Sequence, residues 1–163
     1  MSDEKPTEPI TFERVLEILE KGKVDEEHGA IRWSSNYTFL VTVKHDDTEI
    51  MAVYKPRRGE RPLWDFPDGT LCQRERASFL TSETLGWKLV PPTVLRDGPH
   101  GIGSFQFYIH HDPDVNYFSF DESALPQLKQ LALFDFLVNN ADRKGGHCLM
   151  DDQKHIWGID HGL

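Results

Sequence analysis

The feature that most constrains this chain is an almost wholly apolar helical run at residues 126–138 that leads directly into a polar loop. The next segment predicts a short strand, a turn and a second strand, and it ends at an aspartate between small or apolar neighbours. Asp142 in the loop and Asp160 after the second strand are therefore expected at the rim of a core. Two such carboxylates suit phosphoryl transfer, in which one orients and deprotonates a hydroxyl and the other holds a divalent metal. Taken alone, the pattern fits equally well a turn capped by Asp142 and a loop hydrogen bond accepted by Asp160.

Length and composition predict one domain, or two small lobes, of a cytoplasmic protein. The chain has 163 residues, and its ten Phe and four Trp can supply a core. It has no run of 18 apolar residues and begins with polar ones, so we expect no membrane span and no secretory signal. Cys72 and Cys148 have apolar neighbours and no metal-type spacing, which indicates reduced core thiols. The net charge of −9 argues against nonspecific binding to nucleic acid or to anionic lipid.

Five short segments carry the β-branched and aromatic residues that are typical of strands. The predicted strands, with turns that favour antiparallel pairing, span residues 30–33, 37–43, 49–55, 88–96 and 102–109. Before them we expect a disordered acidic lead, a short helix with an apolar stripe of Val15, Leu16 and Leu19, and a charged connection at 23–29. Lys55 ends the third strand.

A helix is predicted at residues 71–85, between the third and fourth strands. Leu71, Glu75 and Phe79 recur at i, i+4 and i+8, so Glu75 shares a helix face with two apolar side chains. A carboxylate on a buried face needs a cation, because unpaired burial is costly. We predict that Lys55 is this cation. The alternative is a Glu75 at the edge of the stripe, paired with neighbouring arginines or with water.

Four charged positions occur in an order, and on element types, that match a known family. They are Lys55 in the segment 53–56, Glu75 in the inserted helix, Asp142–Arg143 in the polar loop, and Asp160–His161–Gly162 after the last strand. In these residues the chain resembles the protein-kinase-like fold, in the atypical branch of phosphatidylinositol 3-/4-kinase-related proteins and their bacterial relatives. The resemblance covers about residues 30–163. It implies an α+β fold, with a five-stranded antiparallel N-lobe and one inserted helix at 30–110, and a truncated helical C-lobe with the catalytic loop at 111–163, after the lead and short helix at 1–29.

The resemblance implies an ATP-dependent phosphotransferase and gives each of these residues a role. Lys55 would neutralise the α- and β-phosphates of ATP, while Glu75 holds its ammonium by an ion pair. Asp142 would orient the acceptor hydroxyl and take its proton, and Asp160 would ligate a divalent metal on the phosphates. The other expected nucleotide contacts are Ser34, Ser35 and Asn36 of a phosphate-covering turn, Phe107, Tyr108, Ile109 and His110 of a linker that meets the adenine edge, and Ile31, Val53 and Ile159 around the ring.

Two departures from the family pattern change what is expected of the site. The relatives place an asparagine oxygen five residues after the catalytic aspartate, where this chain has His147, and a histidine where it has Lys144. Magnesium prefers oxygen ligands, which leaves three alternatives. His147 contacts phosphate instead of a metal, or the site favours manganese over magnesium, or the second metal is missing. Lys144 would add positive charge near the transferred phosphoryl group. The sequence also ends at Leu163, which implies a truncated second lobe without an activation segment.

The acceptor and two further functions stay open. A nucleotide-binding pseudokinase without turnover fits the missing second lobe and His147. The intact Lys55, Asp142 and Asp160 favour catalysis instead. A zinc site or metal-dependent hydrolase would draw on a set whose spacing matches no common zinc pattern, namely His147, Cys148, His155, Asp160 and His161. The candidate acceptors are a protein serine, a small metabolite and a lipid, and adenylyl transfer is an alternative to phosphoryl transfer. We expect no nucleic-acid partner.

Overall fold

The computed structural model describes residues 9–30 and 37–162, and this part has the α+β fold that the sequence predicts. The helices are α1 (Phe12–Lys21), α2 (Leu71–Leu85) and α3 (Leu125–Leu137). The strands are β1 (Lys23–Ala30), β2 (Phe39–His45), β3 (Thr48–Pro56), β4 (Thr93–Gly98), β5 (Gly101–Phe107), β6 (Cys148–Met150) and β7 (Ile156–Gly158). The predictions made for Ile31, Ser34, Ser35 and Asn36 lie outside the described residues. Among the residues described, no helix is long and apolar enough to cross a bilayer.

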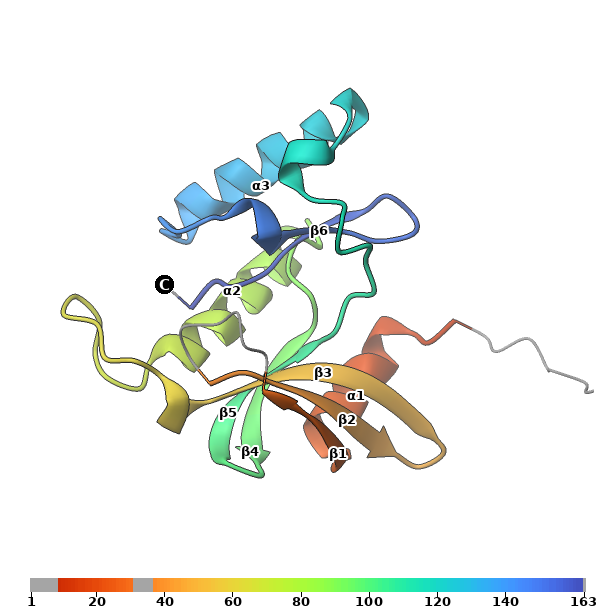
Figure 1. Cartoon of the computed structure of the whole chain (residues 1–163), viewed down its shortest axis with the longest axis vertical. Helices are drawn as coiled ribbons and strands as arrows, with labels where there is room; N and C mark the ends of the chain where they lie inside the picture. Colours follow the sequence, from red (N-terminus) through yellow and green to blue (C-terminus); the bar gives the residue numbers. More distant parts are fainter. Residues whose placement is uncertain (1–8, 31–36, 163) are drawn as a thin grey trace, which may run out of the picture.

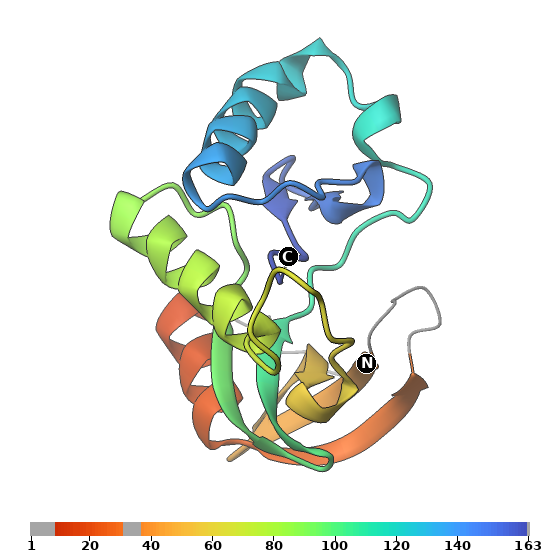
Figure 2. The ribbon, with the colours of Figure 1, turned by 90° about the vertical axis from the view of Figure 1, so that its left-hand side faces the viewer.

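Five strands form one antiparallel sheet in the order β1-β2-β3-β5-β4, and α2 is inserted between β3 and β4 (Figure 1). Helix α1 packs on one face of this sheet, where it contacts β2, β3, β4 and β5. The opposite side faces α3 and the β6–β7 hairpin, and the sheet curls below them (Figure 2). The predicted five-stranded antiparallel sheet with one inserted helix is thus confirmed.

The alternation of β3 decides which side chains face away from α1. Ile50, Ala52 and Tyr54 are buried in the core between α1 and the sheet. Successive side chains of a strand point to opposite faces. Val53 and Lys55 therefore project from the other face, toward the C-terminal elements, and both are only partly buried.

Helix α2 is fixed at both ends. At its start, the Leu71 and Cys72 amides donate to the carboxylate of Glu60, at 3.2 and 2.8 Å. Such a carboxylate satisfies free N–H groups and suits the positive end of the helix dipole. At its end, Gly86 adopts a left-handed φ of +68°, as a helix-terminating glycine does. This anchoring holds Glu75, one turn into the helix, against the sheet.

A second core joins α2 to the C-terminal elements. Phe134 from α3 and Ile156 from β7 are both fully buried. They pack with Phe79 of α2 and with Leu89 and Val90, which follow α2. The polar loop after α3 and the segment after β7 are therefore held in place against the sheet and α2.

Two predicted strand boundaries are wrong. Residues 23–29, expected as a charged connection, form most of β1. This strand lies at the edge of the sheet, pairs irregularly with β2 and is largely exposed, so it needs no apolar pattern. The fourth strand was expected from residue 88, yet β4 begins at Thr93, because Pro91 and Pro92 cannot donate hydrogen bonds to a sheet.

Candidate functional site

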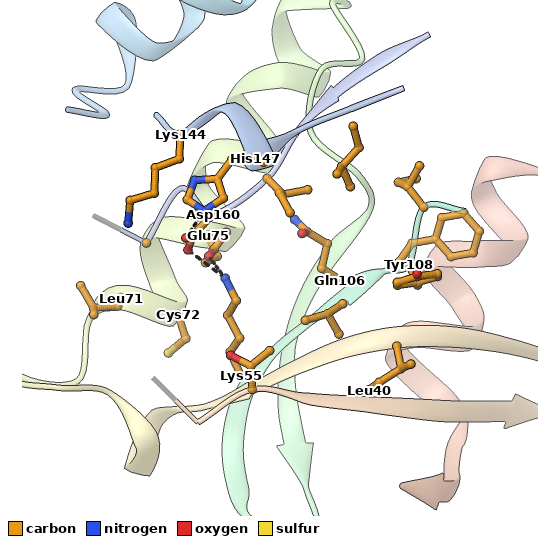
Figure 3. A pocket seen from close by; sticks show the side chains of 18 of the residues that line it. Leu40, Lys55, Leu71, Cys72, Glu75, Gln106, Tyr108, Lys144, His147 and Asp160 are labelled. Carbon is orange, nitrogen blue, oxygen red and sulfur yellow. Dashed lines mark hydrogen bonds and ion pairs between the residues drawn. The ribbon is translucent and has the colours of Figure 1, made fainter. Parts of the chain in front are cut away.

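A cavity of about 710 Å³ lies between the sheet and the C-terminal elements. Strands β2, β3 and β5 line one side, and α2 with the segments after α3 and β7 lines the other. Figure 3 shows Leu40 and Tyr108 toward one end, and Lys144, His147 and Asp160 toward the other. The lining thus combines apolar and ionisable side chains in one space, with further apolar contacts from Val53, Phe107, Ile109, Leu149 and Ile159.

The Lys55 ammonium occupies the centre of the charged end (Figure 3). Its Nζ donates to Glu75 Oε1 at 2.7 Å and to Asp160 Oδ1 at 3.1 Å. The second Glu75 oxygen accepts from the backbone N–H of His161 at 3.2 Å. The predicted ion pair of Lys55 with Glu75 is therefore confirmed. Glu75 is only 3% exposed, as expected for a carboxylate on the buried face of α2.

This geometry changes the acidity of the paired groups. Burial acts to lower the pKa of Lys55, but the charges of Glu75 and Asp160 outweigh it and raise that pKa. Burial acts to raise the pKa of Asp160, but opposing effects, of which the charge of Lys55 is the largest, outweigh it and lower that pKa. The lysine is thus held as an ammonium and Asp160 as a carboxylate.

Backbone hydrogen bonds position Asp160 at the end of β7. Gly158 N–H donates to the carbonyl of Leu89 at 2.7 Å, and Ile159 N–H donates to the carbonyl of His147 at 3.0 Å. Asp160 itself adopts a φ of +63°, in the left-handed region that few residues other than Gly, Asn and Asp enter. The turn directs its carboxylate back toward Lys55.

The polar loop after α3 adds three groups to the charged end. Lys144 Nζ lies 3.0 Å from Asp142 Oδ2, in a pair that is largely exposed. His147 Nε2 lies 3.1 Å from Asp160 Oδ2, whereas its Nδ1 is buried without a hydrogen-bond partner among the described residues. Burial, together with the nearby cations, lowers the pKa of His147 and outweighs the opposite effect of Asp160. The imidazole is therefore neutral near pH 7 and able to ligate a metal.

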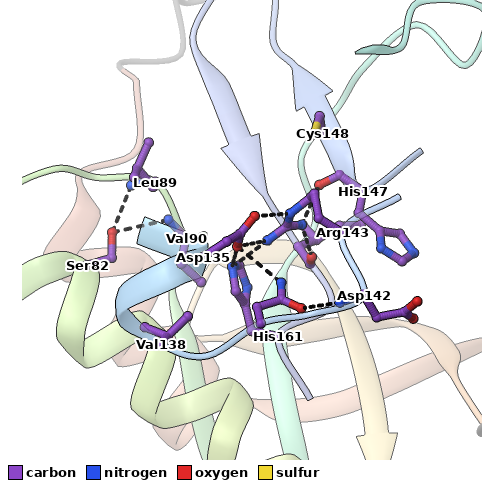
Figure 4. A network of polar contacts seen from close by, with 12 residues as sticks. Ser82, Leu89, Val90, Asp135, Val138, Asp142, Arg143, His147, Cys148 and His161 are labelled. Carbon is purple, nitrogen blue, oxygen red and sulfur yellow. Dashed lines mark hydrogen bonds and ion pairs between the residues drawn. The ribbon is translucent and has the colours of Figure 1, made fainter. Parts of the chain in front are cut away.

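A buried polar network that the sequence reasoning missed connects the two aspartate segments (Figure 4). Arg143 donates to both carboxylate oxygens of Asp135, at 2.7 and 2.8 Å. The same guanidinium donates to the carbonyls of His147 and Ile159. It also lies 2.7 Å from His161 Nε2, which must accept because a guanidinium only donates. Arg143 thus fastens the polar loop to the segment that carries Asp160.

A signal for Asp135 was present in the sequence. Leu128, Leu131 and Asp135 recur at i, i+3 and i+7, so an acid lies on an apolar helix face, as Glu75 does. In the structure Asp135 is 7% exposed. Burial acts to raise its pKa, but hydrogen bonds from Arg143 outweigh it and hold that pKa well below its usual range.

The structure brings most of the predicted site residues to one cavity. Those that line it are Val53, Lys55, Glu75, Phe107, Tyr108, Ile109, Asp142, Lys144, His147, Ile159 and Asp160. His110 is exposed and does not line it, whereas His111 does. The sequence reasoning did not place the other lining residues in the site, among them Gln106, Glu60 and Cys72, although it predicted Cys72 as a core thiol. Burial and the neighbouring Glu60 raise the pKa of Cys72 to about 11, so this thiol is not a nucleophile near neutrality.

The metal-binding capacity of the described residues is small. No group of three or more His, Cys, Asp or Glu side chains is arranged there to hold an ion. Two members of the hypothetical zinc set have other partners: His155 Nε2 contacts the carbonyl of Lys88 at 2.7 Å, and His161 contacts Arg143. Cys148 is buried in the second core, so Asp160 and His147 remain as a pair of metal-ligating groups. This pair suits an ion that takes its other ligands from a substrate, since Mg²⁺ is commonly held by one or two carboxylates plus phosphate oxygens.

Comparison with known proteins gives a relative whose name states no activity. No protein-family model matches the chain. It is 41% identical over 170 aligned positions to Protein Rv2133c of Mycobacterium tuberculosis, an alignment that covers 83% of this chain and 61% of that protein. The chain therefore spans less than two thirds of the length of this relative.

Proposed function

We propose that this protein binds ATP with a divalent metal and is an ATP-dependent phosphotransferase of the phosphatidylinositol 3-/4-kinase-related, protein-kinase-like type. One observation carries the proposal: the Lys55 ammonium lies within 3.1 Å of both Glu75 and Asp160, at a cavity of about 710 Å³. A cavity of ~300–1,000 Å³ is typical of small-molecule sites. Strongly perturbed ionisable groups at such a cavity are typical of a functional centre.

Each part of a nucleotide matches the chemistry of one region of the cavity. The base enters the end near Leu40 and Tyr108, where apolar side chains can stack on both of its faces. The phosphates lie at the other end, where Lys55 supplies a fixed ammonium. Lys55 is oriented by Glu75 before the nucleotide arrives, so little ordering is needed when the phosphates bind.

Asp160 and His147 are the residues that would hold the metal. Their donor atoms lie 3.1 Å apart, and the unpartnered Nδ1 shows that His147 is not committed to another hydrogen bond on that side among the described residues. When bound, Mg²⁺ or Mn²⁺ neutralises charge on the phosphate oxygens. The imidazole favours Mn²⁺ over Mg²⁺ in this pair.

Asp142 is the residue that receives the proton of the acceptor hydroxyl. Its carboxylate is partly exposed and faces the cavity from the polar loop, whose path is fixed by Arg143. Lys144 is paired with Asp142 and is exposed, so it can move toward a phosphoryl group without breaking a buried contact. The acceptor enters from this open side.

A nucleotide-binding protein without turnover is the second candidate. It is favoured by the pairing of each acid at the charged end with a group of the chain itself, Asp142 with Lys144 and Asp160 with both Lys55 and His147. Such a site can bind and sense a nucleotide while its base stays blocked.

Transfer of label from γ-labelled ATP separates the two candidates. The assay uses Mg²⁺ or Mn²⁺ and offers the chain itself, a serine-rich protein, phosphoinositide vesicles and a small polyol as acceptors. Asp142→Asn should abolish transfer while ATP still raises the melting temperature. Asp152→Asn, in the exposed β6–β7 turn, is the matched control and should transfer label normally. ATP-dependent stabilisation with no transfer to any acceptor supports the sensor, and no stabilisation by ATP rejects both candidates.

A further inference from the structure

Gln106 is a buried amide of the cavity wall that the proposed function leaves without a role. It lies on β5, is 8% exposed and lines the cavity, into which its amide points (Figure 3). In the sheet it pairs with Val53, two positions along β3 from Lys55. Gln106 therefore borders the part of the cavity next to Lys55, on the side where the nucleotide base is expected.

The hydrogen bonds of Thr93 fix the orientation of this amide. The Thr93 hydroxyl donates to the carbonyl of Pro91 at 2.8 Å, and a carbonyl has no hydrogen to give back. The single hydroxyl hydrogen of Thr93 is thus engaged with Pro91. Toward Gln106, Thr93 Oγ1 can therefore only accept a hydrogen bond. The Gln106 nitrogen, 2.9 Å away, must face Thr93. Because Thr93 and the Pro91 carbonyl are internal, the amide cannot turn over without losing this bond.

The other end of the amide, Oε1, is consequently an acceptor on the cavity side. It accepts no hydrogen bond from any residue that the structure describes. When a ligand excludes water from this part of the cavity, an acceptor left without a donor is unfavourable, and a ligand that supplies the donor avoids that cost. Oε1 thus favours a donor group on the ligand and disfavours an acceptor at the same place.

The backbone after Gln106 supplies the complementary pattern. Phe107 N–H donates to the carbonyl of Pro92, and Tyr108 N–H donates to the carbonyl of Met51. Ile109 N–H makes no hydrogen bond within the described part of the chain, and Ile109 lines the cavity. This stretch of the wall therefore offers a side-chain acceptor at Gln106 and a backbone donor at Ile109. A 6-aminopurine carries the matching donor and acceptor on one edge, whereas a 6-oxopurine carries them in reverse.

We propose that Gln106, oriented by Thr93, selects a nucleotide with a 6-aminopurine base over one with a 6-oxopurine base. This inference rests on the proposed function, because it takes the ligand to be a purine nucleotide. It adds a residue that determines specificity and that acts through hydrogen bonding to the base. It is independent of whether phosphoryl transfer follows.

Binding of ATP and of inosine triphosphate (ITP) tests the proposal, because the two bases differ only in the 6-amino or 6-oxo group and the N1 proton that accompanies it. Titration calorimetry with the full chain and Mn²⁺ should give an affinity for ATP ~10–100-fold higher than for ITP, as a mismatched buried hydrogen bond costs that much. Gln106→Met, of similar volume, should weaken ATP binding ~10-fold and leave ITP binding little changed, so the ratio should fall ~10-fold, toward the discrimination that the Ile109 N–H supplies alone. An unchanged ratio in Gln106→Met overturns the proposal.

Thr93→Val is a second, independent variant. It keeps the shape of a fully buried side chain but removes the hydroxyl that holds the amide. The Gln106 amide can then turn over and donate to a 6-oxo group, so ITP should gain relative to ATP. Val53→Ala is the control, since the loss of an apolar contact with the base should weaken both nucleotides alike. Failure of the unmodified protein to bind either nucleotide rejects the proposed function itself, whereas tight ATP binding with an unaltered ratio in both amide variants rejects only the role of Gln106.

Discussion

Replacement of Asp135 with asparagine tests the network that fastens the two aspartate segments. Asp135 accepts two hydrogen bonds from Arg143, at 2.7 and 2.8 Å, and one from Asn140 at 3.1 Å. The side chains of the ion pair are only 10% and 17% exposed. Asparagine keeps the shape, removes the charge and turns one acceptor into a donor that faces the guanidinium. Since breaking a buried pair from one side costs ~3–5 kcal/mol, we expect the free energy of unfolding to fall by about 3 kcal/mol.

Urea unfolding of a double-mutant cycle measures this effect. The cycle compares the unmodified protein, Asp135→Asn, Arg143→Met and the double variant, with fluorescence and circular dichroism as probes. Removal of both partners should cost less than the sum of the single changes, with a coupling of about 2 kcal/mol. A loss below about 1 kcal/mol for Asp135→Asn, with no coupling, would show that the network is not what holds the loop.

The pH dependence of stability gives the same pair an independent test. Burial acts to raise the pKa of Asp135, but Arg143 outweighs it, so the folded-state pKa lies below the unfolded value of about 3.9. A lowered folded pKa contributes stability that is fully present above the unfolded value and is lost as the pH falls through the folded one. The difference in unfolding free energy between the unmodified protein and Asp135→Asn should therefore shrink as the pH falls below about 4. A difference that stays constant between pH 6 and pH 3 contradicts this origin.

Three further outcomes follow from the charged end of the cavity. Lys55→Met leaves the buried Glu75 without its cation, so the melting temperature should fall and the stabilisation by ATP should disappear in a thermal-shift assay. His147→Asn replaces a nitrogen donor with oxygen, so the ratio of nucleotide affinity in Mg²⁺ to that in Mn²⁺ should rise ~10-fold by calorimetry. Cys72, with its pKa raised to about 11 by burial and by Glu60, should react with iodoacetamide at pH 8 far more slowly than a free thiol.

The sequence predicted a site contact correctly where a charged residue lies on a helix face that is otherwise apolar. Glu75 lies on an apolar helix face, and the cost of an unpaired buried carboxylate predicted its partner Lys55 across 20 residues. The same conflict exists at Asp135, but the helix around it is so apolar that the acid was overlooked. The interpretation failed where no such conflict exists. Strand β1 is charged because it is an edge strand, and its partner β2 decides its conformation.

Under the proposed function, the cavity also determines the ionic form of the nucleotide that would bind. Among the described residues, its lining holds four carboxylates, from Glu60, Glu75, Asp142 and Asp160, and two ammonium groups. A highly anionic triphosphate without a counterion therefore meets an excess of negative charge, although Lys55 lies at its centre. A divalent metal held by Asp160 and His147 would offset this excess, and Lys55 would then contact the phosphates in place of Asp160. Removal of the metal should accordingly lower the nucleotide affinity by far more than the loss of a single salt bridge would. Calorimetry of ATP with Mn²⁺ and with EDTA measures this dependence, and equal affinities would mean that Asp160 stays paired with Lys55 when the nucleotide binds.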